Sequence, residues 1–144
     1  MQNHTKMKVL VVEDSPTDVK IIERTMKRSA IKCDLFFAAD GAEALDFLFR
    51  RGDFSDVPRP DLILLDLKLP KVDGFEVLKE IKQNDRLRRI PVIVLTVSAR
   101  EEDAARAYDS GAASYMTKPV NPEDFEKLIT TVQEYWRIAM LPKS

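Results

Sequence analysis

Five short apolar segments recur along the chain, and stretches with helical periodicity lie between them. The segments are residues 8–12, 33–38, 62–66, 91–95 and 114–117. Four of them are almost continuously hydrophobic, which is typical of strands that are buried on both faces of a sheet. Strict alternation of strands and helices favours parallel strands joined by right-handed crossovers. The sequence therefore predicts an α/β fold, a doubly wound five-stranded parallel sheet with helices on both faces.

The helical stretches carry start and stop signals at their ends. The signals are Ser15-Pro16 for the first helix, Asp40-Gly41 and Arg51-Gly52 around the second, Ser98 with Glu101 as a capping box, and Asn121-Pro122 for the last. The last helix spaces its apolar residues at three and four: Phe125, Leu128, Ile129, Val132, Tyr135, Trp136 and Ala139. Because these residues form one stripe, we expect it to lie on the sheet.

The length of the chain suits one domain. Its 144 residues, of which 44% are hydrophobic, can bury one substantial core. The polar, proline-containing stretch RRGDFSDVPRP within residues 48–61 predicts a surface loop rather than a domain boundary. We therefore expect a single domain over residues 1–144, with a short polar N-terminal tail and a C-terminal extension of the last helix.

Charge and targeting signals argue against several classes of function. The 23 basic and 24 acidic side chains nearly cancel, so no overall field attracts the chain to nucleic acid or to a membrane surface. We find no secretory signal and no apolar run long enough to cross a bilayer, and we expect a cytoplasmic protein. The one cysteine, Cys33, is predicted to be a buried thiol. The one histidine, His4, lies in the polar tail, which excludes a Ser-His-Asp triad or a multi-histidine zinc site.

Polar side chains follow four of the predicted strands. Glu13 and Asp14 follow the first, Asp66 ends the third, Thr96 follows the fourth and Lys118 follows the fifth. In open α/β sheets the functional crevice lies beyond the carboxyl ends of the strands. We therefore expect three acids, one hydroxyl and one ammonium group to meet at one edge of the sheet.

The three acids, Glu13, Asp14 and Asp66, predict a metal site. Carboxylates this close together repel one another unless a cation lies among them. Oxygen ligands favour a hard ion, so Mg²⁺ fits best and Mn²⁺ could substitute. With the metal bound, Asp66 stays ionised and can attack phosphorus, while Lys118 and Thr96 hold the oxygens of the transferred group.

Each of these residues has a simpler explanation when it is taken alone. Asp66 could be a turn former, and Glu13 and Asp14 could complement the dipole of the following helix. Thr96 could be an ordinary strand residue and Lys118 a solvated surface charge. The functional interpretation depends on their conjunction, because four independent strand ends would otherwise have to converge by chance.

Four motifs, VLVVEDSPTD, LILLDLKLPKVDG, VIVLTVSA and SYMTKPV, stand in this order along the chain. Together they resemble the receiver domain of response regulators over residues 7–136. The resemblance implies a flavodoxin-like fold with strand order 2-1-3-4-5. It also implies a stand-alone response regulator of a two-component phosphorelay, phosphorylated on Asp66 by a partner histidine kinase. Such a domain is a phosphoacceptor that takes part in its own phosphorylation and dephosphorylation, and it is not an enzyme in the usual sense.

The resemblance also implies roles for single residues. The metal ligands that it implies are Glu13, Asp14, Asp66 and the backbone carbonyl of Lys68. Thr96 would sense the phosphate, Lys118 would form a salt bridge with it, and Tyr115 would change its rotamer. A cis peptide bond is expected before Pro119.

Two features point to one group within this family, and two positions differ from the usual family pattern. The long connection FLFRRGDFSDVPRPD and the aromatic tail YWRIAMLP are similar to those of single-domain regulators paired with bacterial phytochromes. Many relatives carry a small residue where this chain has the β-branched Val97, which would narrow access to the phosphate. Lys68 stands where several relatives have asparagine, and we expect its long side chain to obstruct hydrolytic water. Ser98 is too short to block the opposite rim.

The phosphorylated state has to be read by another molecule. A phosphoryl group adds about two negative charges, Thr96 would swing toward it, and Tyr115 would turn from an exposed to a buried rotamer. The surface that changes comprises the fourth helix, the strand at residues 114–117 and the last helix, where we expect a downstream protein to bind. The aromatic pair Tyr135 and Trp136 adds the hypothesis of a homodimer through the same surface.

Three other functions would each require a distinct sequence feature. A phosphatase that works through an aspartyl-phosphate would need an Asp-x-Asp pattern, whereas Leu67 and Lys68 follow Asp66. A flavin carrier of the same fold would need a Ser/Thr-rich phosphate loop after the first strand, which is absent from the sequence. A receiver-like binding module that is independent of phosphorylation is the remaining alternative, and the complete set of acids, threonine and lysine argues against it.

Overall fold

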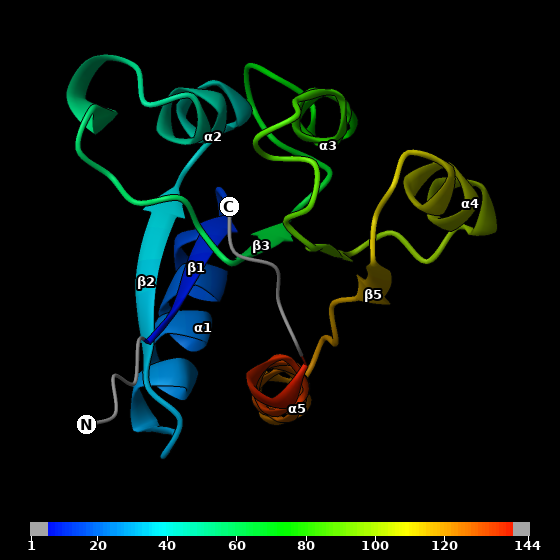
Figure 1. The fold of residues 1–144 in the computed structure, drawn as a ribbon. Coiled ribbons are helices and arrows are strands. Elements are labelled where there is room, and N and C mark those ends of the chain that lie inside the picture. Colours follow the sequence, from blue (N-terminus) through cyan, green and yellow to red (C-terminus); the bar gives the residue numbers. More distant parts are fainter. Residues whose placement is uncertain (1–5, 140–144) are drawn as a thin grey trace.

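The structure is a computed structural model and describes residues 6–139 of the chain. Five parallel strands form one sheet in the order β2-β1-β3-β4-β5 (Figure 1). In chain order the elements are β1 (Met7–Val12), α1 (Pro16–Arg28), β2 (Cys33–Ala38), α2 (Gly41–Leu48), η1 (Gly52–Phe54), β3 (Leu62–Leu65), α3 (Gly74–Gln83), β4 (Val92–Thr96), α4 (Glu101–Asp109), β5 (Ser114–Thr117) and α5 (Pro122–Ile138). The predicted doubly wound sheet and its strand order are confirmed.

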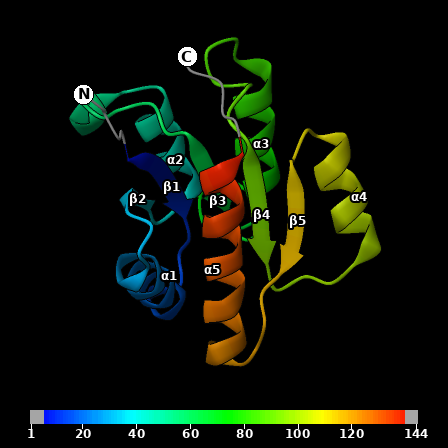
Figure 2. The same cartoon turned by 60° about the horizontal axis from the view of Figure 1, so that its bottom comes forward.

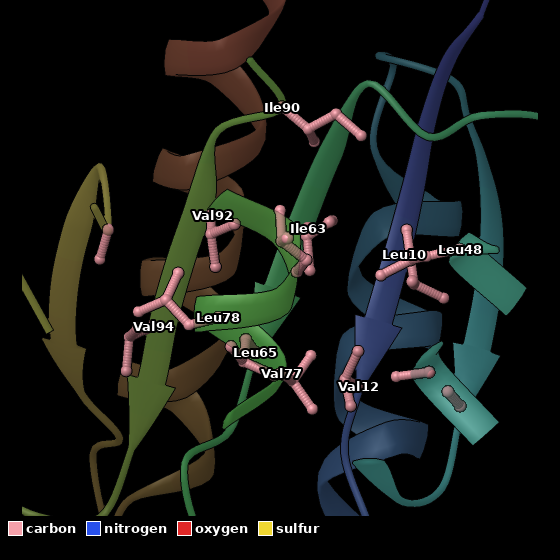
Figure 3. Packing of buried hydrophobic residues seen from close by; sticks show 14 of the residues in the cluster. Leu10, Val12, Leu48, Ile63, Leu65, Val77, Leu78, Ile90, Val92 and Val94 are labelled. Atoms are coloured by element: carbon pink, nitrogen blue, oxygen red, sulfur yellow. The ribbon is translucent and has the colours of Figure 1, made fainter. Parts of the chain in front are cut away.

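Helices cover both faces of the sheet, which explains why its central strands are almost continuously hydrophobic. Successive residues of a strand point to opposite faces. In β1, Val9 and Val11 belong to the core under α1 and α5, whereas Leu10 and Val12 belong to the core under α2, α3 and α4 (Figure 2). Figure 3 shows the second core, where side chains of α3 pack onto β3 and β4. The ends of the strands are therefore held rigidly from both sides.

Three of the predicted helix starts are confirmed and one is wrong. The side chains of Ser15, Asp40 and Asn121 accept hydrogen bonds from backbone N–H groups of the first turns of α1, α2 and α5. The capping box between Ser98 and Glu101 does not form, because α4 begins two residues later than that pattern requires, after the N-cap Arg100. The hydroxyl of Ser98 instead donates to a carboxylate oxygen of α4.

Helix α5 lies on the sheet as predicted, but its buried stripe differs at two positions. Tyr135 is 58% exposed, whereas its neighbour Trp136 packs partly buried against the core under α1 and α5. Gln133 is fully buried instead, and its amide donates to the carbonyl of Ile31 at 2.8 Å and to the sulfur of Cys33 at 3.4 Å. This side chain ties α5 to the segment between α1 and β2.

Three further sequence expectations concern the connection, the thiol and the histidine. Leu48 is the last, buried residue of α2, and residues 49–61 form a surface connection as predicted, with residues 50–53, 55 and 56 exposed. Phe54 of η1 packs on Phe47 with ring centroids 5.6 Å apart. The thiol of Cys33 is half-buried rather than buried, and its burial raises its pKa. His4 lies outside the described residues. Between residues 6 and 139, no helix combines the length and hydrophobicity that a bilayer span requires.

Two glycines allow the loop between β3 and α3 to pack tightly. A Cβ atom on Gly74 would lie 2.5 Å from the carbonyl oxygen of Asp66 and 2.5 Å from the Cα atom of Leu67. A Cβ atom on Gly41, at the start of α2, would overlap the backbone of Val72 in the same loop. Side chains at these positions would push the loop, and with it the backbone of Asp66, out of place.

We predict that Gly74→Ala destabilises the protein even though alanine is the better helix former. Helix propensity favours alanine by about 1 kcal/mol. The overlap with backbone atoms, which cannot rotate away, opposes it with about 3 kcal/mol, so the net free energy of unfolding falls by roughly 2 kcal/mol. Chemical denaturation measures this difference. Gly52→Ala is the control, because nothing lies within 4 Å of its Cβ position and only its positive φ opposes the change. A Gly74→Ala protein as stable as the original would contradict the tight packing.

Candidate functional site

The polar residues that follow the strands meet at one edge of the sheet. Glu13 follows β1, Asp66 follows β3, Thr96 ends β4 and Lys118 follows β5, and all four are buried. Backbone hydrogen bonds between neighbouring strand ends fix the distances between these residues. The N–H of Asp66 donates to the carbonyl of Val12 at 3.0 Å, and the N–H of Lys118 donates to the carbonyl of Thr96 at 2.7 Å. The convergence predicted from the sequence is therefore present in the fold.

Three acids of this edge form a compact cluster. Carboxylate oxygens of Glu13, Asp14 and Asp66 all lie within 4.8 Å of one another. Glu13 and Asp66 are buried, whereas Asp14 is exposed. One cation placed among them could contact all three, and carboxylate oxygens are the ligands that hard divalent ions prefer. The cluster therefore fits a divalent metal ion, and the carbonyl of Lys68 as a further ligand stays a prediction.

The ammonium group of Lys118 joins the carboxylates of three other elements. Its Nζ atom lies 2.6 Å from Glu13 Oε1, 2.9 Å from Asp18 Oδ2 and 3.0 Å from Asp66 Oδ2. The side chain of Lys118 is 6% exposed. This buried ion cluster connects β1, the first turn of α1, the end of β3 and the end of β5.

Asp18 is the site residue that sequence reasoning missed. It lies in the first turn of α1, where an acid ordinarily complements the helix dipole, and that explanation hides its second contact. One signal was available. Asp18 comes three residues after the N-cap Ser15, so its side chain starts from the end of the helix that faces the strand edge. Only the fold shows that Lys118, one hundred residues further along the chain, reaches it.

Burial and mutual charge shift the pKa values of the central pair. Burial raises the pKa of Glu13 to about 7, helped by the charge of Asp66, although Lys118 and the N–H of Ser15 stabilise the ionised form. Burial works to lower the pKa of Lys118, but its hydrogen bonds and its attraction to Glu13, Asp18 and Asp66 outweigh burial and raise the pKa. The ammonium group is therefore always charged, whereas Glu13 can hold a proton near neutral pH.

The carboxylate of Asp66 is held by its own loop as well as by Lys118. Its Oδ1 atom accepts a hydrogen bond from the N–H of Lys68 at 3.2 Å. The side chain of Lys68 is exposed, and so is that of Val97, which follows Thr96 and is 62% exposed. Both side chains therefore lie on the surface next to the site and not inside it.

Thr96 and Tyr115 connect this edge to the surface of α4 and β5. The Oγ1 atom of Thr96 is buried and has no hydrogen-bond partner within residues 6–139. Tyr115 is half-buried, and its hydroxyl donates to the carbonyl of Ser98 at 2.9 Å. Its backbone N–H donates to the hydroxyl of Tyr108 at 3.0 Å. Ser98, two residues after Thr96, is thus hydrogen-bonded to the side chain of Tyr115 in β5.

The cis peptide bond expected before Pro119 is wrong for this structure. No peptide bond between residues 6 and 139 is cis. The trans form is the lower in energy for most X-Pro bonds, by about 0.5–1 kcal/mol. Lys118 reaches all three carboxylates with a trans bond after it, so the ion cluster does not require the other isomer.

Comparison with known proteins agrees with this geometry. A family model of the response regulator receiver domain matches residues 9–130, and the chain belongs to this family. The response regulator Rcp1 of Synechocystis sp. is 44% identical over 128 residues, which cover 89% of this chain and 87% of Rcp1. The probable methanogenesis regulatory protein FilR2 of Methanothrix harundinacea is 42% identical over 129 residues, covering 89% of this chain and 82% of FilR2.

Solved structures give the same assignment. The phosphorylated cyanobacterial phytochrome response regulator RcpA superposes with a TM-score of 0.93 at 38% identity, covering 96% of this chain and 100% of RcpA. The Mn²⁺-bound form of Rcp1 superposes with a TM-score of 0.91 at 43% identity, covering 95% of this chain and 99% of Rcp1. The acids Glu13, Asp14 and Asp66 therefore fit the divalent metal site of a receiver domain.

We predict that metal affinity increases as the pH rises through about 7. The folded, metal-free protein holds the Glu13 proton more tightly than the unfolded chain does. In the unfolded chain this carboxyl group has its ordinary pKa of 4.5. The stability that this proton contributes is full below pH 4.5 and is lost as the pH rises through about 7. A divalent cation needs the ionised carboxylate and has to displace the proton. Its affinity should therefore fall by up to about tenfold per pH unit below 7.

Calorimetric titration with Mn²⁺ at a series of pH values measures this dependence. Glu13→Gln is the matched variant, since it should bind the ion more weakly but with little change between acidic and neutral pH. Equal affinities on both sides of pH 7 in the original protein would show that Glu13 does not release a proton on binding.

Proposed function

We propose that this receiver domain accepts a phosphoryl group on Asp66 from a partner sensor histidine kinase. The observation that carries the proposal is the position of Asp66. Its buried carboxylate lies at the end of β3, 3.0 Å from the ammonium group of Lys118 and beside two acids that fit a divalent cation. Phosphoryl transfer depends mainly on positioning and on neutralisation of charge, and this edge supplies both.

The transfer requires little covalent chemistry from the protein. A carboxylate oxygen of Asp66 attacks phosphorus, a P–O bond forms, and the P–N bond of the donor phosphohistidine breaks with its electron pair left on the imidazole ring. Lys118 is close enough to Asp66 to bind an oxygen of the transferred group. We propose Mg²⁺ as the physiological ion, held by Glu13, Asp14 and Asp66, where it would supply the positive charge that neutralises phosphoryl oxygens.

The first test uses a small phosphodonor. With acetyl phosphate and Mg²⁺ the protein should gain one phosphoryl group, and Asp66→Asn should abolish this gain while the fold is kept, because the amide is a far weaker nucleophile. Intact-mass measurement detects the group, and circular dichroism checks the fold. Asp53→Asn makes the same chemical change at an exposed aspartate of η1 and should label normally. Undiminished labelling of Asp66→Asn would falsify the assignment.

Thr96 is the residue we propose as the sensor of the phosphoryl group. Its buried hydroxyl has no partner among the described residues, and such a group gains the most from a new acceptor nearby. Movement of Thr96 toward the phosphoryl group would displace the carbonyl of Ser98 that Tyr115 now binds. We therefore propose that Tyr115 changes position with phosphorylation and alters the surface of α4, β5 and α5, where a downstream protein binds.

We propose a phytochrome-like kinase as the donor and the cytoplasm as the compartment. The support is similarity: RcpA is a cyanobacterial phytochrome response regulator, and it matches this chain over its whole length. The match to 87% of Rcp1 likewise supports a regulator that consists of this one domain. Phosphotransfer from a purified phytochrome kinase, compared with an unrelated histidine kinase at equal concentration, distinguishes this donor from others.

The lifetime of the phosphorylated state is expected to depend on Lys68. This exposed side chain starts two residues after Asp66, and its backbone N–H already contacts that carboxylate. A long cation there can pair with phosphoryl oxygens and obstruct the water that must approach phosphorus in line. Ser98 on the other side is short and already donates to Asp103 at 2.6 Å.

We predict that Lys68→Ala shortens the lifetime of phosphorylated Asp66 by roughly two- to fivefold without preventing phosphorylation, which corresponds to a charged contact of about 0.5–1 kcal/mol. Loss of the phosphorylated mass with time in Mg²⁺ measures it. Lys71→Ala is the control, because this exposed lysine of the same loop pairs with Asp40 at 3.5 Å. A Lys68→Ala lifetime equal to or longer than that of the original protein would reject the role.

We also propose a homodimer through α4, β5 and α5. A groove of about 650 Å³ lies between β5 and α5 and is lined mainly by apolar side chains, among them Met116, Leu128 and Val132. Tyr135 lines the same groove and is 58% exposed. A two-fold interface pairs the same surface of two copies, so this apolar groove and the exposed Tyr135 that lines it would face their counterparts on a second copy.

Sedimentation velocity with and without phosphorylation tests the dimer. We expect dimers at high protein concentration in at least one of the two states, and Tyr135→Glu should dissociate them because it places a charge in an apolar interface. Ser55→Glu adds the same charge at an exposed residue after η1, near the opposite edge of the sheet from β5, and should leave association unchanged. A monomer in both states at high concentration would exclude the proposed dimer.

A further inference from the structure

The ammonium group of Lys118 has as many carboxylate neighbours as it has N–H donors. A lysine ammonium group carries three donors. Asp18 and Asp66 accept hydrogen bonds from it at 2.9 and 3.0 Å, and Glu13 forms an ion pair with it at 2.6 Å. A phosphoryl oxygen on Asp66 can therefore bind Lys118 only if one of these carboxylates gives up its place.

Two of the three carboxylates are poorly placed to leave. The side chain of Glu13 is 3% exposed, and its second oxygen accepts the N–H of Ser15 at 3.0 Å. Its departure from Lys118 would leave a carboxylate with little access to water, and a divalent cation held by Glu13, Asp14 and Asp66 would keep that carboxylate at the site rather than release it. Asp66 carries the phosphoryl group itself: esterification removes its own charge, but its remaining carbonyl oxygen can still accept from Lys118, so the added phosphoryl oxygens compete for the donors that the other two carboxylates hold.

Asp18 can leave at the lowest cost. Its side chain is 23% exposed, the largest exposed fraction of the three, so water can replace the ammonium group as its partner. It lies in the first turn of α1, where its negative charge is also stabilised by the helix dipole. Asp18 is thus the neighbour of Lys118 that a phosphoryl oxygen can replace.

We propose that Asp18 is a positioning residue that holds Lys118 in the unphosphorylated protein and yields it to the phosphoryl group. This inference rests on the proposed function of Asp66. Before transfer, Asp18 keeps the ammonium group among the carboxylates. After transfer, a phosphoryl oxygen takes its place, and the side chain of Asp18 turns to water at the start of α1. Asp18 therefore competes with the phosphoryl group, and it signals the exchange to the surface of α1.

The competition can be measured with beryllofluoride, which binds an aspartate carboxylate as a stable analogue of the phosphoryl group. Asp18→Asn keeps the size of the side chain but makes it a weaker partner for Lys118, so calorimetry in Mg²⁺ should show beryllofluoride binding roughly five- to tenfold more tightly, the equivalent of one charged hydrogen bond. Asp18→Glu restores the charge and should bind about as the original protein does. Glu23→Gln removes one charge from the exposed face of the same helix and should not change the affinity.

A spectroscopic measurement separates competition from a merely structural effect. In the original protein, beryllofluoride should shift the carboxyl carbon resonance of Asp18, because that group loses its ammonium partner, and it should leave the carboxyl resonance of Glu23 unchanged. Equal or weaker binding by Asp18→Asn, an equal gain in Glu23→Gln, or an unshifted Asp18 resonance would overturn the role of Asp18. Failure of the proposed function has a different signature. Asp66 would then not be the beryllofluoride site, and the original protein and Asp66→Asn would give the same binding result.

Discussion

The ion cluster around Lys118 is the interaction on which the acidic edge of this domain depends. Glu13, Asp14, Asp18 and Asp66 would bring four negative charges together, and the fold places one ammonium group among them. Breaking a buried pair by removing one partner typically costs about 3–5 kcal/mol, because the other charge stays buried. The cluster also joins parts of the chain that are far apart in sequence, so the site forms only when the sheet is complete.

The buried hydrophobic strands fix the positions of the charged groups in this cluster. All four residues of β3 are buried, and side chains from both faces of the sheet hold the strand in place. Asp66 follows directly, and its position therefore follows from the core rather than from a flexible loop. The loop that continues from it packs so closely against Gly41 and Gly74 that a single added methyl group would overlap its backbone. Core packing and the absence of two side chains thus determine where the carboxylate lies.

Local sequence patterns were sufficient to predict the strands, three of the helix starts and the polar residues at the strand ends. Periodicity and capping chemistry act over a few residues, and the convergence of Glu13, Asp66 and Lys118 follows from parallel topology alone. The remainder depended on tertiary contacts. Gln133 is a polar residue in a buried position because backbone carbonyls of another segment meet it there. Asp18 looked like an ordinary first-turn acid because its partner comes from the other end of the chain.

The contact between the backbone N–H of Tyr115 and the hydroxyl of Tyr108 has a consequence for association. β5 is the outermost strand of the sheet, and outermost strands offer unpaired backbone groups to which a strand of another molecule can add. Here a side chain of α4 occupies one of those groups, and the strand is only four residues long. Extension of the sheet by a foreign strand is thus disfavoured at this side. A molecule that recognises this face has to do so through side chains of α4, β5 and α5, which are the groups that a change in Tyr115 would rearrange.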